Sequence, residues 1–239
     1  MHFEMDWAVL WRPPNGDLAL NAVLTTLKLS LVSWVFALIL GTLAGVARDS
    51  PHRAVRLLAT CYVEVFRNIP LLVQLFFAYY VLPRLLPIEL RRELFALGWE
   101  AISAILTLSL YTSAKVAEHV RAGANAVDRQ VRWGAMSTGL TWWQAQRFVI
   151  VPLFLRVIVP SLTSEFVTVF KSSSVAMTVG VVETSYFTQE LGLQTFHWIE
   201  ANSLGTAVYL VCAWSVAGLM ALIERWARVP GLLRRGAAG

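Results

Sequence analysis

Five long apolar stretches constrain this chain more than any other feature of its sequence. Three of them carry at most one charged residue each: Asn21–Ala47, Ala101–Ala117 and Leu204–Ile223. A helix of about 20 mostly apolar residues crosses the hydrocarbon core of a bilayer. Two further stretches, about Leu57–Leu82 and about Val157–Val179, have the necessary length with polar interruptions. The sequence therefore predicts an all-α membrane protein with about five transmembrane helices.

Lys and Arg are distributed unevenly over the segments that join these stretches. They are frequent after the first stretch, between the third and the fourth, and after the fifth, whereas the alternate segments are richer in Asp and Glu. Since loops rich in Lys and Arg stay in the cytoplasm, we expect the N-terminus outside and the C-terminus inside. The net charge of +5 is spread over these flanks, so no nucleic-acid partner is expected.

These boundaries divide the chain into three parts. We expect a periplasmic segment at 1–20, a single transmembrane domain at 21–226 and a cytoplasmic tail at 227–239. The apolar chain is interrupted in the longest cytoplasmic connection, where residues 128–152 are too polar to span a membrane.

The interruption has the local signals of two short helices joined by a turn. Asp128 is a candidate N-cap, and Gly139 stands where a helix ends with a left-handed residue. Thr141 and Gln144 have the spacing of a capping box. The second helix should stop or bend near Pro152. We therefore expect a helix-turn-helix finger in the cytoplasm.

Trp142 and Trp143 begin the second helix of this finger and allow two interpretations. Large amphipathic rings are enriched at protein interfaces, and Gly134 and Ala135 in the first helix permit close approach of another surface. Tryptophan also gathers at the headgroup level of membranes. Side-chain chemistry alone leaves both interpretations open.

The finger resembles the cytoplasmic signature of bacterial ABC-importer permeases, the EAA motif E-A-A-x-x-x-G followed by I-x-L-P. Trp133 occupies the place of the glutamate, Gly139 is the glycine and Pro152 ends the second part. The resemblance implies a coupling helix that docks on a separate ATP-hydrolysing subunit, with a more apolar fit at Trp133. The coupling residues that it implies are Trp133, Gly134, Ala135, Gly139, Trp142, Trp143 and Pro152.

Three further stretches resemble the polar amino acid branch of this family: Tyr62–Phe77, Ala114–Gln130 and Val157–Gly180. The likeness runs from Thr25 to Pro230 and is greatest to glutamate/aspartate importer permeases. It implies the binding-protein-dependent ABC importer permease fold, placed in the lipid bilayer of a bacterial inner membrane. Glutamate or aspartate is the substrate that it implies, with glutamine, histidine or arginine as the alternative.

The resemblance also implies an assembly. It consists of a second permease subunit, either a sister chain or a copy, two ATP-binding subunits and a periplasmic amino-acid-binding protein. ATP is then used by the partner, and this chain binds no cofactor. Its sequence has no G-x-x-x-x-G-K-[ST] phosphate loop and no catalytic constellation.

Ionisable residues inside the predicted spans are candidates for the translocation path, since charge at the centre of a membrane helix usually faces protein or water. Lys171 is suited to an acidic substrate, but it also fits a counter-ion for a carboxylate on another helix, or a side chain that reaches the interface. Glu165 lies six positions earlier and points to another side. The path candidates are Lys171, Ser172, Ser173, Ser174, Glu165 and Gln74.

Glu64 and Arg67 lie three positions apart on one helix face and are predicted to form a structural pair. The four histidines are scattered along the chain, so no metal site is expected. A secondary carrier would show an internal repeat with broken helices in both halves, and a membrane enzyme would show paired acids or clustered histidines. The sequence shows neither pattern, which favours the importer permease.

Overall fold

The computed structural model describes residues 5–127 and 129–227, and within these ranges the chain is helical with no β-strand. This confirms the predicted all-α class. Asp128, the predicted N-cap of the finger, and nearly all of the predicted tail lie outside the described residues. The α-helices are α1 (Asn15–Ala47), α2 (Arg53–Asn68), α3 (Leu71–Phe76), α4 (Ile88–Ala96), α5 (Trp99–Ala126), α6 (Arg129–Ser137), α7 (Trp142–Ala145), α8 (Val151–Ser172), α9 (Thr184–Thr195) and α10 (Trp198–Ala227).

The five predicted stretches fall on long helices or on bent helix pairs. α1, α10 and the stretch Trp142–Val179, which contains α8, are long and apolar enough to cross a membrane. The other two are bent pairs: α2 meets Leu71–Leu85 at 106°, and α4 meets α5 at 91°. Counting each bent pair as one span gives the predicted five.

The break after α2 has a local cause in the sequence. Pro70 disfavours helical backbone in the residue before it, and Ile69 is extended with φ −93° and ψ 130°. The amide of Gln74 then donates to the carbonyl oxygens of Phe66 and Ile69, at 2.9 and 2.7 Å. Gln74, predicted to line the translocation path, is thus buried and fastens the two sides of this break.

Two glycines let α1 and α5 pack with their backbones close together. A Cβ added at Gly41 would lie 2.6 Å from the carbonyl oxygen of Ser113, and one at Gly45 would lie 2.8 Å from that of Ala117. These distances are shorter than any relaxed contact, so only a residue without a side chain fits. The α1–α5 pair is therefore the frame on which the remaining helices are placed.

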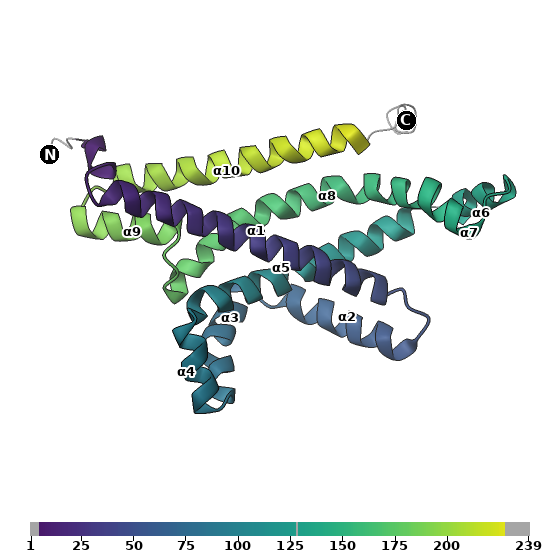
Figure 1. The fold of residues 1–239 in the computed structure, drawn as a ribbon, viewed down its shortest axis with the longest axis horizontal. Coiled ribbons are helices and arrows are strands. Elements are labelled where there is room, and N and C mark those ends of the chain that lie inside the picture. Colours follow the sequence, from purple (N-terminus) through teal and green to yellow (C-terminus); the bar gives the residue numbers. More distant parts are fainter. Residues whose placement is uncertain (1–4, 128, 228–239) are drawn as a thin grey trace.

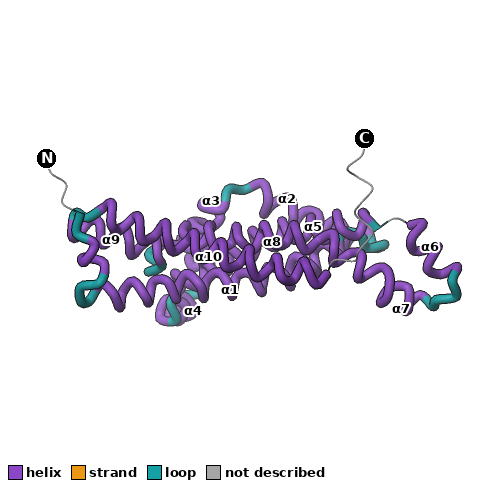
Figure 2. Tube along the Cα trace, turned by 90° about the horizontal axis from the view of Figure 1, so that it is seen from above, coloured by secondary structure: helices purple, strands orange, loops and turns teal. Residues whose placement is uncertain are grey.

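The bundle is elongated, and its two ends differ. α9 and the first helical turn near the N-terminus lie at one end, whereas α6 and α7 lie at the opposite end (Figure 1). The same order along the long axis is visible from above (Figure 2). Only 11% and 6% of the most apolar windows of Trp142–Val179 and α10 are buried within the chain. These helices offer wide apolar faces to lipid or to a second chain.

A buried carboxyl group fastens the α9 end of the bundle. Glu183 is 0% exposed and caps α9, accepting a hydrogen bond from the backbone N–H of Tyr186 at 3.0 Å. Its other oxygen accepts from the hydroxyl groups of Tyr209 and Thr26. Burial raises the pKa of Glu183, while the hydrogen bonds from Tyr209 and Tyr186 oppose that rise. One carboxyl group thereby joins α1, α9 and α10.

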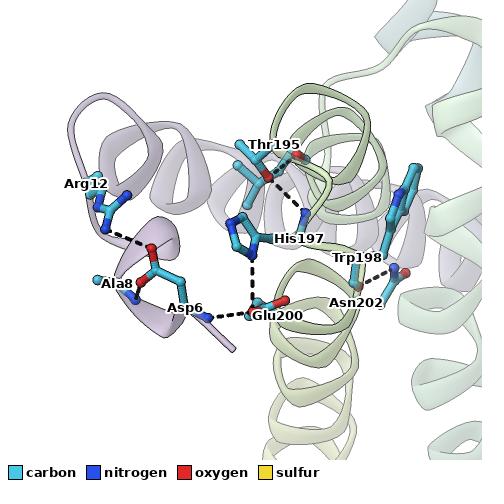
Figure 3. Close-up of polar contacts among 9 residues, drawn as sticks. Asp6, Ala8, Arg12, Thr195, His197, Trp198, Glu200 and Asn202 are labelled. Atoms are coloured by element: carbon cyan, nitrogen blue, oxygen red, sulfur yellow. Dashed lines mark hydrogen bonds and ion pairs between the residues drawn. The ribbon is translucent and has the colours of Figure 1, made fainter. Parts of the chain in front are cut away.

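A second carboxylate at this end holds the first residues of the described chain. Glu200 Oε1 accepts the backbone N–H of Asp6 at 2.8 Å and lies 3.3 Å from Nδ1 of His197 (Figure 3). Asp6 in turn pairs with Arg12 at 2.7 Å. Phe196, beside His197, has a left-handed backbone with φ 62° and is 82% exposed. The N-terminal turn is thus fixed against the start of α10.

Candidate functional site

Five ionisable side chains line a cavity of about 300 Å³ where α2, α5 and α8 meet. Three of them lie on α5 at helical spacing, so that they share one face of that helix. One comes from the last turn of α2, beside the break at Ile69 and Pro70, and one comes from the middle of α8. The lining residues are Arg67, Lys115, Glu118, His119 and Glu165.

Two guanidinium groups bind one carboxylate on the first side of this cavity. Arg67 Nη1 lies 2.9 Å from Oε1 of Glu118, and the same oxygen accepts a hydrogen bond from Nη1 of Arg48. Arg48 is only 7% exposed. Since a buried cation needs a paired carboxylate, Glu118 keeps Arg48 in place.

The prediction that Glu64 and Arg67 pair with each other is wrong. Arg67 pairs with Glu118, whereas Glu64 lies 3.9 Å from Arg48 and accepts a hydrogen bond from Asn68 at 3.1 Å. Spacing along α2 placed the two side chains on one face, but α1 and α5 supply closer and better buried partners. The ionic contacts therefore run between helices rather than along one.

The second side of the cavity has a carboxylate as its centre. Glu165 lies 3.5 Å from Nζ of Lys115 and 3.4 Å from Nε2 of His119. Its Oε2 is buried and accepts no hydrogen bond from the described residues. Lys115 also lies 4.6 Å from the centre of the Tyr111 ring. Lys115 and His119 thus hold Glu165 in place, and Oε2 is the oxygen that Lys115 approaches.

This arrangement suits a small ion that carries charges of both signs. The cationic side, with Arg67 and Lys115, can bind a carboxylate, and Glu165 can bind an ammonium group. Among the lining residues, Arg67 and Lys115 balance Glu118 and Glu165, and Arg48, which does not line the cavity, lies 3.9 Å from Glu64. Glu64 is the nearest further carboxylate, but about half of its side chain is exposed, so water screens its charge.

The other predicted path residues do not converge on this cavity. Lys171 is exposed, and no ion pair of it occurs among the described residues. Ser173 is fully buried and donates to the carbonyl of Phe170, while Ser174 donates to that of Lys171. Ser172 and Ser174 each line another, separate hollow. Of the six candidates, only Glu165 lines the ionisable cavity.

The finger is present at the opposite end of the bundle from α9. Gly139 has φ +87°, as its predicted place after a helix requires. Thr141 and Gln144 form the predicted capping box: Gln144 N donates to Thr141 Oγ1, and Gln144 Oε1 accepts from Thr141 N at 2.9 Å. Of the predicted stop or bend near Pro152, the stop does not occur, because a π-helical turn, Gln146–Ile150, joins α7 to α8.

Large apolar side chains cover the finger and contact little else. Trp133 is 72% exposed, Trp142 49% and Trp143 76%. The rings of Trp142 and Trp143 meet edge to face with centroids 4.6 Å apart. A Cβ added at Gly134 would meet nothing within 4 Å. The finger therefore presents an open apolar surface rather than a packed one.

Comparisons with known proteins place this geometry in a context. Residues 18–229 match the family model described as binding-protein-dependent transport system inner membrane component. The chain is 34% identical over 241 residues to the glutamate/aspartate import permease protein GltJ of Escherichia coli (strain K12), covering 97% of this chain and 98% of the relative. It is 28% identical to the glutamine transport system permease protein GlnP of the same strain, covering 93% and 97%.

A solved structure has the same fold. The crystal structure of an amino acid ABC transporter with histidines contains a chain that superposes with a TM-score of 0.78 and 27% identity. The superposition covers 94% of this chain and 100% of that chain. The helices that form the cavity and the finger thus belong to a shared architecture.

Proposed function

Because the chain belongs to the binding-protein-dependent transport system inner membrane components, we propose that it forms half of the path through which an ATP-driven importer moves glutamate or aspartate. As a member of this family it is an inner-membrane permease of an amino acid ABC importer, with ATP-binding and substrate-binding components as its partners. It has no enzymatic role of its own, because ATP hydrolysis is carried out by the separate subunit.

The ionisable cavity is the observation that supports this substrate class. An α-amino acid carries one carboxylate and one ammonium group, which Arg67 and Glu165 are placed to bind. An acidic amino acid carries a second carboxylate, and Lys115 is the further cation at the cavity that can bind it. Charge buried in a membrane protein is expensive unless it is paired, so a substrate that completes the pairing is favoured over one that does not.

Transport measurements on charge-neutral variants test this proposal. Glutamate and glutamine differ in one charge at nearly equal size, so their uptake is compared for Arg67→Met, for Lys115→Met and for the control Lys28→Met, whose side chain is exposed on α1. A lost charge contact of about 1.4 kcal/mol corresponds to a tenfold loss of affinity. Lys115→Met should raise the KM for glutamate about tenfold, with a smaller change for glutamine, because only glutamate has the second carboxylate. Arg67→Met should raise the KM for both about tenfold, because both have the α-carboxylate, and the control should change neither.

Two results would argue against acidic substrates. Equal losses for glutamate and glutamine in Lys115→Met would mean that this cation only supports the structure. A wild-type complex that transports glutamine, histidine or arginine and ignores glutamate would keep the importer and change the substrate. Lys171 and the serines after it remain proposed path residues, to be tested in the same assay.

The finger is the proposed contact to the ATP-hydrolysing subunits. It lies at the end of the bundle away from α9, and the π-helical turn connects it rigidly to α8, which carries Glu165. A movement of the finger is therefore transmitted along one continuous helix to the cavity. Two such permeases, each with five spans, enclose the path between them, and a periplasmic amino-acid-binding protein delivers the substrate.

A further inference from the structure

The charge of the finger is mostly positive, with Asp128 as the one acidic residue in its sequence. From Arg129 to Ile150 the sequence contains three arginines and no Asp or Glu. Arg132 and Arg147 are exposed, and neither takes part in an ion pair among the described residues. Arg147 instead lies 5.8 Å from the centre of the Phe148 ring. Uncompensated cations on a surface attract a partner that carries acidic groups.

An apolar hollow lies beside Arg132 on α6. A hollow of about 730 Å³ on α6 is lined by Arg132, Trp133, Met136 and Ser137. Trp133 is 72% exposed and Met136 is 48% exposed. Large aromatic and Met side chains are the ones that interfaces use as buried anchors. The hollow is concave, which suits an inserted protein side chain better than the flat surface of a membrane.

The finger does not need these apolar side chains for its own fold. Ser137 Oγ donates to the carbonyl of Trp133 at 2.9 Å, and Thr138 Oγ1 donates to that of Ala135 at 2.7 Å. Gly139 makes the turn, and the capping box of Thr141 starts the next helix. Because backbone capping holds the turn, the exposed Trp133 is free to act at an interface.

We propose that the finger fits an ATPase docking groove with an apolar floor and a rim of Asp and Glu. Trp133 and Met136 insert into the floor, and Arg132 and Arg147 meet the acidic rim. This inference rests on the proposed function and names the chemistry of the partner. A groove lined by Lys or Arg, which would suit a finger that carries a carboxylate, is excluded by the same charges.

The test measures binding of the ATPase subunit that supports ATP-dependent uptake to the full-length permease in lipid nanodiscs. The variants are Trp133→Ala, Trp133→Glu and the double charge reversal Arg132→Glu/Arg147→Glu. Two matched controls remove the same side-chain types from the rest of the chain: Phe196→Ala, an aromatic residue that is 82% exposed at the opposite end, and Arg92→Glu on α4, which is exposed.

Both Trp133 variants should weaken binding at least about tenfold, as expected for an interface anchor. The charge reversal should weaken it about tenfold at low salt, and salt at about 0.5 M should remove most of that difference. The controls should bind as the wild type does. Wild-type affinity in Trp133→Glu, or tighter binding after charge reversal, would overturn the proposal and indicate a basic groove.

Unchanged binding in every finger variant would also overturn the proposal, and would leave the membrane surface as the place where the tryptophans lie. The proposed function fails separately. If the complex binds with the expected pattern but accumulates no amino acid with ATP, the transport assignment is wrong and the finger chemistry stands. If uptake depends on ATP while binding ignores the substitutions, the finger chemistry is wrong and the transport assignment stands.

Discussion

Glu118 holds two arginines at the wall of the cavity, and its removal gives a sharp test of that arrangement. In Glu118→Met, Arg48 loses its buried partner while remaining only 7% exposed. Removing one partner of a buried ion pair costs about 3–5 kcal/mol. Glu118 is 27% exposed and Glu64 stays 3.9 Å from Arg48, so the lower end, about 3 kcal/mol, is expected.

Thermal unfolding of the purified permease measures this loss. For a chain of this length, 1 kcal/mol shifts the Tm by about 2–4 °C, so the Tm of Glu118→Met should fall by about 6–12 °C. The double variant Arg48→Met/Glu118→Met removes both charges, and apolar replacement of a buried pair is often neutral. It should recover most of the lost stability, and the exposed control Glu93→Met on α4 should melt as the wild type does.

The double variant is compared with the single variants Glu118→Met and Arg48→Met. Its difference from the sum of their effects isolates the interaction between the two side chains. A fall of less than about 2 °C in Glu118→Met would mean that Arg48 reaches water or another partner easily. Additive losses in the double variant would mean that each side chain acts by packing alone. Either result would refute a cavity wall built on paired charge.

Three further predictions concern the packing of α1 against α5, the α9 end of the bundle and the finger. Gly41→Ala should lower the Tm because its Cβ would lie 2.6 Å from a backbone oxygen of α5, at an overpacking cost of about 1–3 kcal/mol. Gly218→Ala, with open space around it, is the control. Equal effects of the two substitutions on the Tm would contradict the close packing of α1 and α5. The raised pKa of Glu183 means that its stabilising effect is complete below the unfolded value of about 4.3 and is lost as pH rises through the folded value. At pH values above the unfolded value, melting curves should therefore depend less on pH in Glu183→Gln than in the wild type, and parallel curves would count against a raised pKa. Gly139→Val should reduce ATPase activity stimulated by the permease, because a β-branched residue at φ +87° is strained by about 1–2 kcal/mol. Gly218→Ala, outside the finger and with open space around it, should leave the activity unchanged. Normal stimulation in Gly139→Val would show that the turn is not part of the coupling.

The helices and the finger could be predicted because their causes are local. Apolar length predicts the spans, and a glycine followed by Thr141 and Gln144 predicts the turn and the next helix. Pro152 predicted a stop or a bend because proline removes a backbone donor, and the helix continues there through a π-helical turn just before it. Such a turn depends on packing that no short sequence window contains.

The cavity could be predicted only in part because its contacts join four helices. Glu165 was identified as an ionisable residue within a span, but its partners Lys115 and His119 lie on α5. The spacing of Lys115, Glu118 and His119 on one helix face was a usable signal, since such a face tends to meet complementary charge. The pairing of Arg48 and Arg67 with Glu118 had no such signal in the sequence, because it depends on how closely the glycines of α1 approach α5.

Uptake by proteoliposomes is the most direct test of the central claim. Liposomes would contain this chain, its second permease subunit and the ATPase, with the amino-acid-binding protein outside and with or without ATP inside. Labelled glutamate, aspartate, glutamine, histidine and arginine would be supplied separately. We expect ATP-dependent accumulation of glutamate and aspartate in preference to glutamine, histidine and arginine. Accumulation without ATP in an intact complex would contradict it.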